Sequence, residues 1–334
     1  MKKVFLLLAI SLISLFFNSC DSITDSTDPI KQIANWNTSS ISRDGNTLIV
    51  GSDNGSIFIS NDGGNNWKEI EPAGDDDFNW QVSSISKDGK IIVTGVFNGR
   101  LYLSSDGGKN WQETRPAGDV NNWWVTASMS DDGKTIVVGT INRLYLTNDG
   151  GSTWKEVRPA GNVDEWWQTT SISGDGKTIM AGIYQWKLYI TKDGGTNWFE
   201  TTPAGYTYKK WWASSVSGDG KIILAAVKGQ RLYISTNGGS SWNETQPAGN
   251  NDITWQATAA SNDGKYLMAA AKDGRLYIST NSGTNWQETQ PAGNADLPWQ
   301  ICSMSGDGKI MLAGIYGGRV YLSTNYGGSW KEAF

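Results

Sequence analysis

The octapeptide S104-S-D-G-G-K-N-W111 recurs along the chain and is the feature that decides the fold. Closely similar segments end in a tryptophan at a spacing of 43 or 44 residues. Self-similarity with a period of this length is typical of proteins built from repeats of one structural unit. We therefore divide the chain into seven repeats, whose octapeptides end at Trp67, Trp111, Trp154, Trp198, Trp242, Trp286 and Trp330.

A second tryptophan column runs in step with the first. It lies 13 residues after each of the first six octapeptides, and Trp36 extends it by one repeat toward the N-terminus. The other members of this column are Trp80, Trp124, Trp167, Trp211, Trp255 and Trp299. Fourteen of the 18 tryptophans are thus repeat positions, for which a structural role is the simplest interpretation.

Each repeat contains four short strand-like runs. In the second repeat they are WQVSSIS (80–86), IIVTGVF (91–97), RLYLS (100–104) and WQET (111–114). Asp-Gly and Asn-Gly pairs between apolar runs indicate hairpins, because glycine accepts the positive φ that tight turns need. Four antiparallel strands per repeat predict an all-β, seven-bladed β-propeller of four-stranded blades over residues 36–334.

The character of the runs supports this prediction. The first runs are small and polar, as expected where strands crowd around one axis, and the second runs are apolar on both faces, as expected between neighbouring blades. The first run of the first repeat begins at Trp36, and the last repeat ends with a fourth run. We therefore expect the ring to close by packing of the last blade on the first, without an exchanged strand.

The S-x-D-G-G-x-x-W segments resemble the Asp-box, or BNR repeat, of sialidases, sortilin-type receptors and photosystem II stability/assembly factors. The resemblance covers all seven repeats and implies that the box is a folding element between the third and fourth strands. The acidic position of the box is Asp in four repeats and Asn in three, which keeps a hydrogen-bonding turn residue but loses the charge. We therefore assign a structural role to Asp62, Asp106, Asp149, Asp193, Asn237, Asn281 and Asn325.

No catalytic set emerges from the remaining residues. The chain has no histidine, which removes the commonest general base and most zinc sites. The resemblance to sialidases implies an arginine triad, a tyrosine–glutamate pair and an aspartic acid, and no such set is recognised. Asp164 and Glu165 are interpreted as solubilising loop acids, and the acidic run 75–77 lacks the spacing of a calcium loop. We expect no metal, no cofactor and no catalytic residue, with a sialidase-like glycoside hydrolase as the least favoured alternative.

The N-terminus has the character of a bacterial lipoprotein signal. Two lysines precede the apolar run 4–17, which is too short to span a bilayer comfortably, and Cys20 follows it. We expect a signal peptide over 1–19, a lipid on Cys20 and a polar tether over 20–35, which would anchor the protein in the cell envelope, at the outer membrane or cell surface. Plain secretion is the alternative. Cys302 is expected to be a small buried residue.

One edge of the predicted propeller collects the candidate binding residues. In an up-and-down blade, the loop between blades and the turn between the second and third strands share an edge. This edge carries PAG…W loops and a recurrent cation, which either binds ligand or stacks on a column tryptophan to seal the seam. A glutamate two residues after each octapeptide is interpreted as part of a solvated face. The cations are Arg100, Arg143, Lys187, Arg231, Arg275 and Arg319.

Four tryptophans lie outside both columns, and three of them adjoin a column tryptophan. Neighbouring residues on an extended segment point to opposite sides, so the added member of each pair should face outward. Blades 3 to 5 thus gather an aromatic sector that also includes Trp167, Trp211 and Tyr184. The predicted ligand contacts in and beside it are Trp123, Trp166, Trp186, Trp212, Tyr206 and Tyr208.

Exposed aromatic rings beside cations suit either a glycan or a protein partner. The favoured hypothesis is a non-catalytic, monomeric propeller that recognises a glycan at this edge. The alternative, implied by similarity to assembly factors, is a protein-binding scaffold whose cations meet an acidic surface. The net charge of −5 argues against nucleic acid as the partner.

Overall fold

The apolar runs between the recurrent turns form antiparallel strands throughout the computed structural model. It describes residues 33–53, 55–74, 78–205 and 208–334. Among these residues 28 strands occur and no helix, and each strand pairs with its sequence neighbours in consecutive groups of four. The prediction of an all-β chain built from four-stranded antiparallel units is confirmed.

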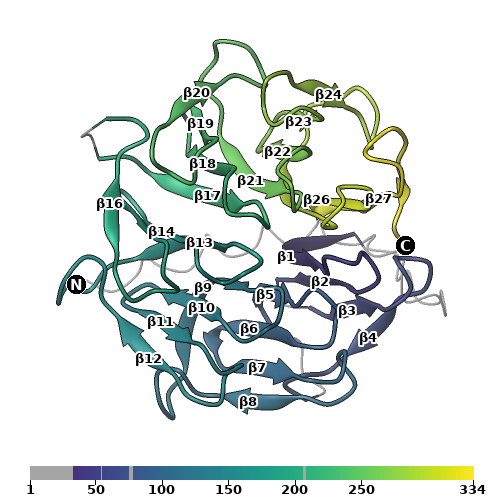
Figure 1. Cartoon of the computed structure of the whole chain (residues 1–334). Helices are drawn as coiled ribbons and strands as arrows, with labels where there is room; N and C mark the ends of the chain where they lie inside the picture. Colours follow the sequence, from purple (N-terminus) through teal and green to yellow (C-terminus); the bar gives the residue numbers. More distant parts are fainter. Residues whose placement is uncertain (1–32, 54, 75–77, 206–207) are drawn as a thin grey trace, which may run out of the picture. The chain divides into compact units, whose positions relative to one another are not determined.

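The first strand of each group is the innermost, and the fourth is the outermost (Figure 1). The first strands are β1 (Ala34–Ile41), β5 (Trp80–Ile85), β9 (Asn122–Met129), β13 (Trp167–Ile172), β17 (Trp211–Val216), β21 (Trp255–Ala260) and β25 (Trp299–Met304). The second strands are β2 (Leu48–Ser52), β6 (Ile92–Gly99), β10 (Ile136–Thr140), β14 (Ile179–Ile183), β18 (Ile223–Val227), β22 (Leu267–Ala271) and β26 (Met311–Gly318).

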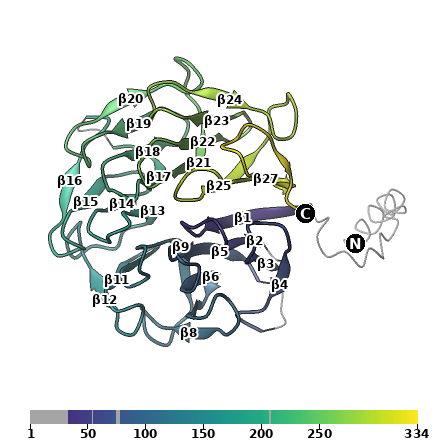
Figure 2. The same cartoon turned by 45° about the vertical axis from the view of Figure 1, so that its right-hand side comes forward.

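The outer half of each group consists of two shorter strands. The third strands are β3 (Ile57–Ser60), β7 (Leu101–Ser104), β11 (Leu144–Thr147), β15 (Leu188–Thr191), β19 (Leu232–Ser235), β23 (Leu276–Ser279) and β27 (Val320–Ser323). The fourth strands are β4 (Lys68–Ile70), β8 (Gln112–Thr114), β12 (Lys155–Val157), β16 (Phe199–Thr201), β20 (Asn243–Thr245), β24 (Gln287–Thr289) and β28 (Lys331–Glu332). Figure 2 shows fourth strands such as β8, β16 and β24 at the rim.

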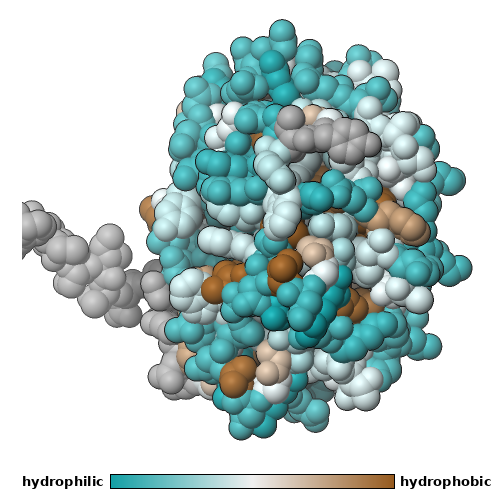
Figure 3. Space-filling model, turned by 90° about the vertical axis from the view of Figure 1, so that its left-hand side faces the viewer, coloured by the Kyte–Doolittle hydropathy of each residue, from teal (hydrophilic) through white to brown (hydrophobic). Residues whose placement is uncertain are grey.

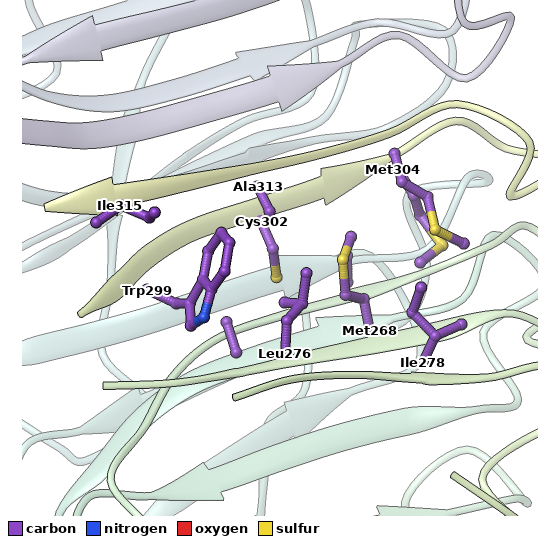
Figure 4. Close-up of a cluster of buried hydrophobic side chains, with 11 residues drawn as sticks. Met268, Leu276, Ile278, Trp299, Cys302, Met304, Ala313 and Ile315 are labelled. Atoms are coloured by element: carbon purple, nitrogen blue, oxygen red, sulfur yellow. The ribbon is translucent and has the colours of Figure 1, made fainter. Parts of the chain in front are cut away.

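The core lies between neighbouring groups. Most residues of the second strands are fully buried, as expected for strands covered on both faces. Figure 4 shows one such layer, where Leu276 and Met268 face Trp299 and Cys302 of the next group. Cys302 is buried as predicted, and burial raises the pKa of its thiol, which keeps it protonated.

Both tryptophan columns join groups together. The column of Trp80 is at most 3% exposed at every position, and its rings pack against a tyrosine or phenylalanine of the third strand, edge-on in every case but the tilted pair of Trp167 and Tyr189. In the octapeptide column, the indole Nε1 of Trp154 donates to Thr114 Oγ1 of the preceding group at 2.8 Å. Trp242 makes the same bond to Thr201. At these positions the rings and indole N–H groups contact the protein itself, which favours a structural role.

The octapeptide turn is held by its acidic residue. Asp106 accepts hydrogen bonds from Ser104 Oγ and from the backbone and side chain of Asn110. These bonds lower the pKa of Asp106 to about 2. Asn237 replaces the acid in a later group, where its Oδ1 accepts from the backbone of Ser241 and its Nδ2 donates to Ser241 Oγ. The turn therefore keeps its shape without the charge.

Ring closure involves more than the packing that we predicted from the sequence. The start of β1 pairs with the end of β26, where Ala34 lies opposite Gly318. The ring of Phe334 fills the seam, with centroids 5.5 Å from Trp36 and 5.0 Å from Trp67. Backbone pairing and a terminal aromatic side chain thus join the last group to the first.

Candidate functional site

The loops between groups and the turns between second and third strands share one edge, as predicted. Backbone pairing joins them directly: Trp186 in the turn after β14 pairs with Lys209 in the following loop, and Gln230 pairs with Ile253 in the next repeat. Phe97 at the end of β6 pairs with Trp123 at the start of β9. This edge therefore contains nearly all of the predicted ligand contacts.

The recurrent cations of this edge are already paired. Arg231 Nε lies 3.0 Å from Asp252 in the following loop and 3.6 Å from Glu244 on β20. We call such a cation with its fourth-strand glutamate and loop aspartate a carboxylate clamp. The same clamp forms around Arg100, Arg143 and Arg275. Lys187 and Arg319 pair only with the fourth-strand glutamate among the described residues.

The clamps correct two interpretations made from the sequence. The cations face carboxylates and do not stack on the column tryptophans. The recurrent glutamates are more than a solvated face, because the side chain of Glu113 is only 28% exposed and contacts Arg100. A cation held between two carboxylates has little remaining charge to offer a ligand.

The aromatic sector divides into parts with different exposure. Trp167 and Trp211 are only 3% exposed, so they do not belong to a surface patch. Trp123 and Trp166 are each 42% exposed, which agrees with the predicted outward direction. Trp123 packs on Phe97 with ring centroids 5.1 Å apart, and its Nε1 donates to Asn98.

One exposed cluster lies where the first strands of two groups begin. Tyr184 contacts Trp166 with ring centroids 5.1 Å apart and contacts Trp212 at 6.0 Å. The ammonium of Lys228 lies 3.5 Å from the centre of the Trp212 ring, a cation–π geometry. We call Trp166, Tyr184, Trp212 and Lys228 the tryptophan–lysine cluster.

Lys228 differs in its electrostatics from the clamp cations. Among the described residues it forms no ion pair with a carboxylate. Burial lowers the pKa of Lys228, and the charges of Lys272 and Lys210 lower it further, whereas Tyr184 raises it. The cluster therefore presents unneutralised positive charge beside half-exposed aromatic rings.

Trp186 and Tyr208 belong to a separate pocket. Their ring centroids are 6.1 Å apart, and Lys187 Nζ lies 5.8 Å from the Trp186 ring. The pocket has a volume of about 250 Å³ and is also lined by Glu200 and Trp211. The predicted contact Tyr206 lies outside the described residues.

The carboxylates considered for catalysis have local partners. Asp164 pairs with Arg143 in a clamp, while burial raises the pKa of the neighbouring Glu165. The acidic run 75–77 falls outside the described residues. Within the described ranges, no cluster of three acidic or cysteine side chains is placed to hold a metal ion. The same residues include no helix with the length and apolar character needed to cross a membrane.

Solved structures with similar folds cover nearly the whole chain. A structure described as YCF48 bound to a D1 peptide has a TM-score of 0.67 at 16% identity, over 89% of this chain and 93% of that one. YCF48 from Cyanidioschyzon merolae has a TM-score of 0.66 at 16% identity, over 89% and 97%. Hydrazine synthase of Kuenenia stuttgartiensis has a TM-score of 0.68 at 16% identity, over 91% and 99%.

The chain folds as a β-propeller. At the level of sequence, a model of the family described as Sortilin-Vps10 (sortilin, neurotensin receptor 3) matches residues 55–185. No curated protein matches the sequence. Identities of 16% support the fold alone, so the function has to be argued from the side chains of this propeller.

Two of the residues that shape the site were missed by the sequence reasoning. Lys228 follows the second strand of its blade, and its backbone N donates to the Lys210 carbonyl beside Trp212. Glu200 lines the pocket although it belongs to the repeated glutamates. The strand register could have located both, since it sets Tyr189 opposite Glu200 and sets Trp211 opposite Val227, the residues next to Trp212 and Lys228.

Proposed function

We propose that this propeller is a non-catalytic binding protein whose tryptophan–lysine cluster takes an acidic, extended segment of a partner protein. The observation that carries the proposal is the position of Lys228 over Trp212 without a carboxylate partner among the described residues. A partially desolvated ammonium gains more from an incoming carboxylate than an exposed one does, because less water screens the pair.

The rest of the cluster fits the same ligand. Trp166 is 42% exposed and Tyr184 and Trp212 are half-buried, so their rings can cover apolar side chains of the segment. The charges of Lys210 and Lys272 are close enough to lower the pKa of Lys228, so these two lysines extend the positive area around the cluster. Complementary charge speeds association with an acidic partner and helps to exclude others.

A peptide ligand is also known for a propeller of similar fold, the YCF48 structure with its bound D1 peptide. From this comparison we propose for the present chain only that a peptide binds to the propeller.

We further propose that the ring has seven blades with Asp-box turns and spans residues 36–334. A lipid on Cys20 and the tether 20–35 would hold the monomer in the bacterial cell envelope.

The favoured glycan hypothesis is weakened at the symmetric positions of the edge. Its recurrent arginines were candidates for ligand binding, yet Arg100, Arg143, Arg231 and Arg275 each contact two carboxylates. Two blades depart from this arrangement among the described residues: Arg319 pairs only with Glu332, and Lys187 replaces the arginine and pairs only with Glu200.

Peptide binding tests the proposal directly. The chain from Asp21 to Phe334 contains every described strand, and Lys31–Phe334 form one compact unit. We expect it to bind a labelled peptide of alternating glutamate and leucine, but not the matched lysine–leucine peptide, in fluorescence anisotropy. Lys228→Glu and Trp212→Ala should each weaken binding by about tenfold or more, which corresponds to ~1.4 kcal/mol.

Two matched controls make this experiment specific. Trp123→Ala removes an exposed tryptophan outside the cluster that has Phe97 as its neighbour, and Lys90→Ala removes an exposed lysine that pairs with Asp88 in a turn between first and second strands. Both should leave the affinity unchanged. Equal affinity for the two peptides, or binding that survives Lys228→Glu, would contradict the proposal.

A further inference from the structure

The blade β13–β16 lacks the carboxylate clamp because three positions have changed together. Three residues before the column tryptophan, the blades around it have Asp164, Asp252 and Asp296, but this loop has Tyr208. The clamp arginine is replaced by Lys187, and the residue before it is Trp186, where other blades have small or polar residues. The full clamp is present in four other blades, where its cation is Arg100, Arg143, Arg231 or Arg275.

The result of these changes is a cavity at the place of the clamp. Of the carboxylates in the described part of the chain, Lys187 pairs only with Glu200, at 2.7 Å, and none of them bridges it to the following loop. The space of about 250 Å³ is lined by Lys187, Glu200, Trp186 and Tyr208, the residues that correspond to a clamp and its surroundings. The pocket is therefore built by substitutions at repeat positions, on the same backbone as its neighbours.

The walls of the pocket are aromatic, and hydrogen bonds hold the backbone of Trp186. The backbone N of Trp186 donates to the Ile183 carbonyl at 3.2 Å, and its carbonyl accepts from Trp211 Nε1 at 3.2 Å. The Tyr208 ring stands at 70° to the Trp186 ring and is 73% exposed. Rings of this kind, placed on a supported backbone, suit the C–H face of a flat, saturated ring better than a flexible chain.

The polar groups of the pocket have almost no net charge. Lys187 and Glu200 form an ion pair, and the pKa of Lys187 is raised chiefly by its hydrogen bond to Glu200. An ionised ligand would have to compete with this pair, whereas hydroxyl groups can accept from the ammonium and donate to the carboxylate. The volume lies below the ~300–1,000 Å³ of pockets for drug-sized ligands, so one ring fits.

We propose that the pocket between Trp186, Tyr208, Lys187 and Glu200 binds a single neutral sugar ring. The ring stacks on the aromatic walls, and its hydroxyls contact Lys187 and Glu200. This site is distinct from the tryptophan–lysine cluster. The two sites have no residue in common, but they meet at two neighbouring tryptophans. Trp211 lines the pocket, and Trp212 contacts Lys228 in the cluster.

Ligand-observed saturation-transfer NMR on residues 21–334 tests the site with methyl glycosides of glucose, galactose, mannose and N-acetylglucosamine, and with N-acetylneuraminic acid as a charged probe. We expect a signal for at least one neutral glycoside and a weaker one for the acid. The double variant Lys187→Arg/Tyr208→Asp rebuilds the clamp of adjacent blades and should abolish the signal. Tyr208→Phe keeps the aromatic wall and should retain it.

The outcomes separate this proposal from the peptide proposal. Because the clamp occurs in neighbouring blades, the double variant should fold, and an unchanged thermal unfolding midpoint verifies this. Lys228→Glu should leave the sugar signal unchanged, and the double variant should leave peptide binding unchanged. The absence of a signal from every neutral glycoside, stronger binding of the acid, or full binding by the double variant would overturn the sugar site.

Discussion

Two neighbouring blades show how this propeller combines a repeated scaffold with local chemistry. In blade β17–β20, Arg231 connects Glu244 on β20 to Asp252 in the loop, and the edge is closed by charge pairs. In blade β13–β16, the same backbone carries Lys187 and Tyr208 and leaves a pocket. The strands and column tryptophans are equivalent in both. The repeat therefore fixes the scaffold, and the positions that break it create binding sites.

The surface near these blades agrees with small, local binding sites on a repeated scaffold. On the side of the molecule that carries β16 in Figure 1, the space-filling view is mostly hydrophilic with small, separate hydrophobic patches (Figure 3). A permanent subunit interface needs a larger and more apolar area. Small sites formed by a few aromatic and charged side chains fit this surface better.

The largest expected effect is on the free energy of unfolding, and it separates tryptophans of the repeat columns from those outside them. Trp255 is 2% exposed and packs on Tyr277, so Trp255→Ala should lower the free energy of unfolding by about 3–5 kcal/mol. Trp212→Ala should lower it by less than about 1 kcal/mol, because Trp212 is partly exposed and belongs to no repeat column. Urea unfolding monitored by circular dichroism measures both. Similar losses for the two variants would show that added tryptophans are structural as well.

Much of the scaffold was predictable because the same signals occur in every repeat. Gly107 and Gly108 adopt positive φ in the turn between β7 and β8, as the Asp-Gly-Gly motif indicates. The strand alternation also separates exposed Trp123 from buried Trp124 correctly. The backbone pairing at ring closure, Ala34 opposite Gly318, matches the pairing of Asn122 with Gly99 between β9 and β6, whereas the packing of Phe334 is specific to this seam and has no repeated signal in the sequence.

The candidate site was harder to predict because its contacts cross between strands. A clamp joins Arg100, directly before β7, to Glu113 on β8. Nothing in the linear sequence identifies these two residues as partners. The same limit applies to Lys228, which reaches Trp212 through the register of β17 and β18. A pattern of residue types locates the edge, while the side-chain partners depend on register.

A smaller effect is expected where a clamp is broken. Arg231→Ala removes a cation that is 25% exposed and leaves Glu244 and Asp252 close together. Partly solvated pairs contribute about 0.2–1 kcal/mol, so the free energy of unfolding should fall by about that amount at low salt. The loss should shrink in molar salt, which screens the pair. Chemical unfolding at the two salt concentrations tests this, and a loss that is independent of salt would contradict a role for charge.

The smallest expected effect is a difference in the pH dependence of stability between octapeptide turns with Asp and those with Asn. Hydrogen bonds hold the pKa of Asp106, Asp149 and Asp193 at about 2, below the ~3.9 of an unfolded aspartate. A group with a depressed folded pKa stabilises the protein above its unfolded pKa, and this contribution is lost as the pH falls from about 4 through 2. Asn237, Asn281 and Asn325 cannot titrate. The triple variant with Asn at the three Asp positions should therefore lose less of its thermal stability than the parent between pH 5 and pH 2.

The reverse substitution sharpens the same comparison. Asn237→Asp adds a titrating group to a turn in which Ser235 and the backbone of Ser241 already donate to the Asn237 oxygen. An aspartate there should accept the same bonds and add the Ser241 hydroxyl as a donor, so its pKa should fall as that of Asp149 does. The thermal unfolding midpoint of this variant should drop more steeply with acid than that of the parent. Parallel pH profiles for all three proteins would show that the charge of these turns is irrelevant to stability and that only their hydrogen-bond geometry matters.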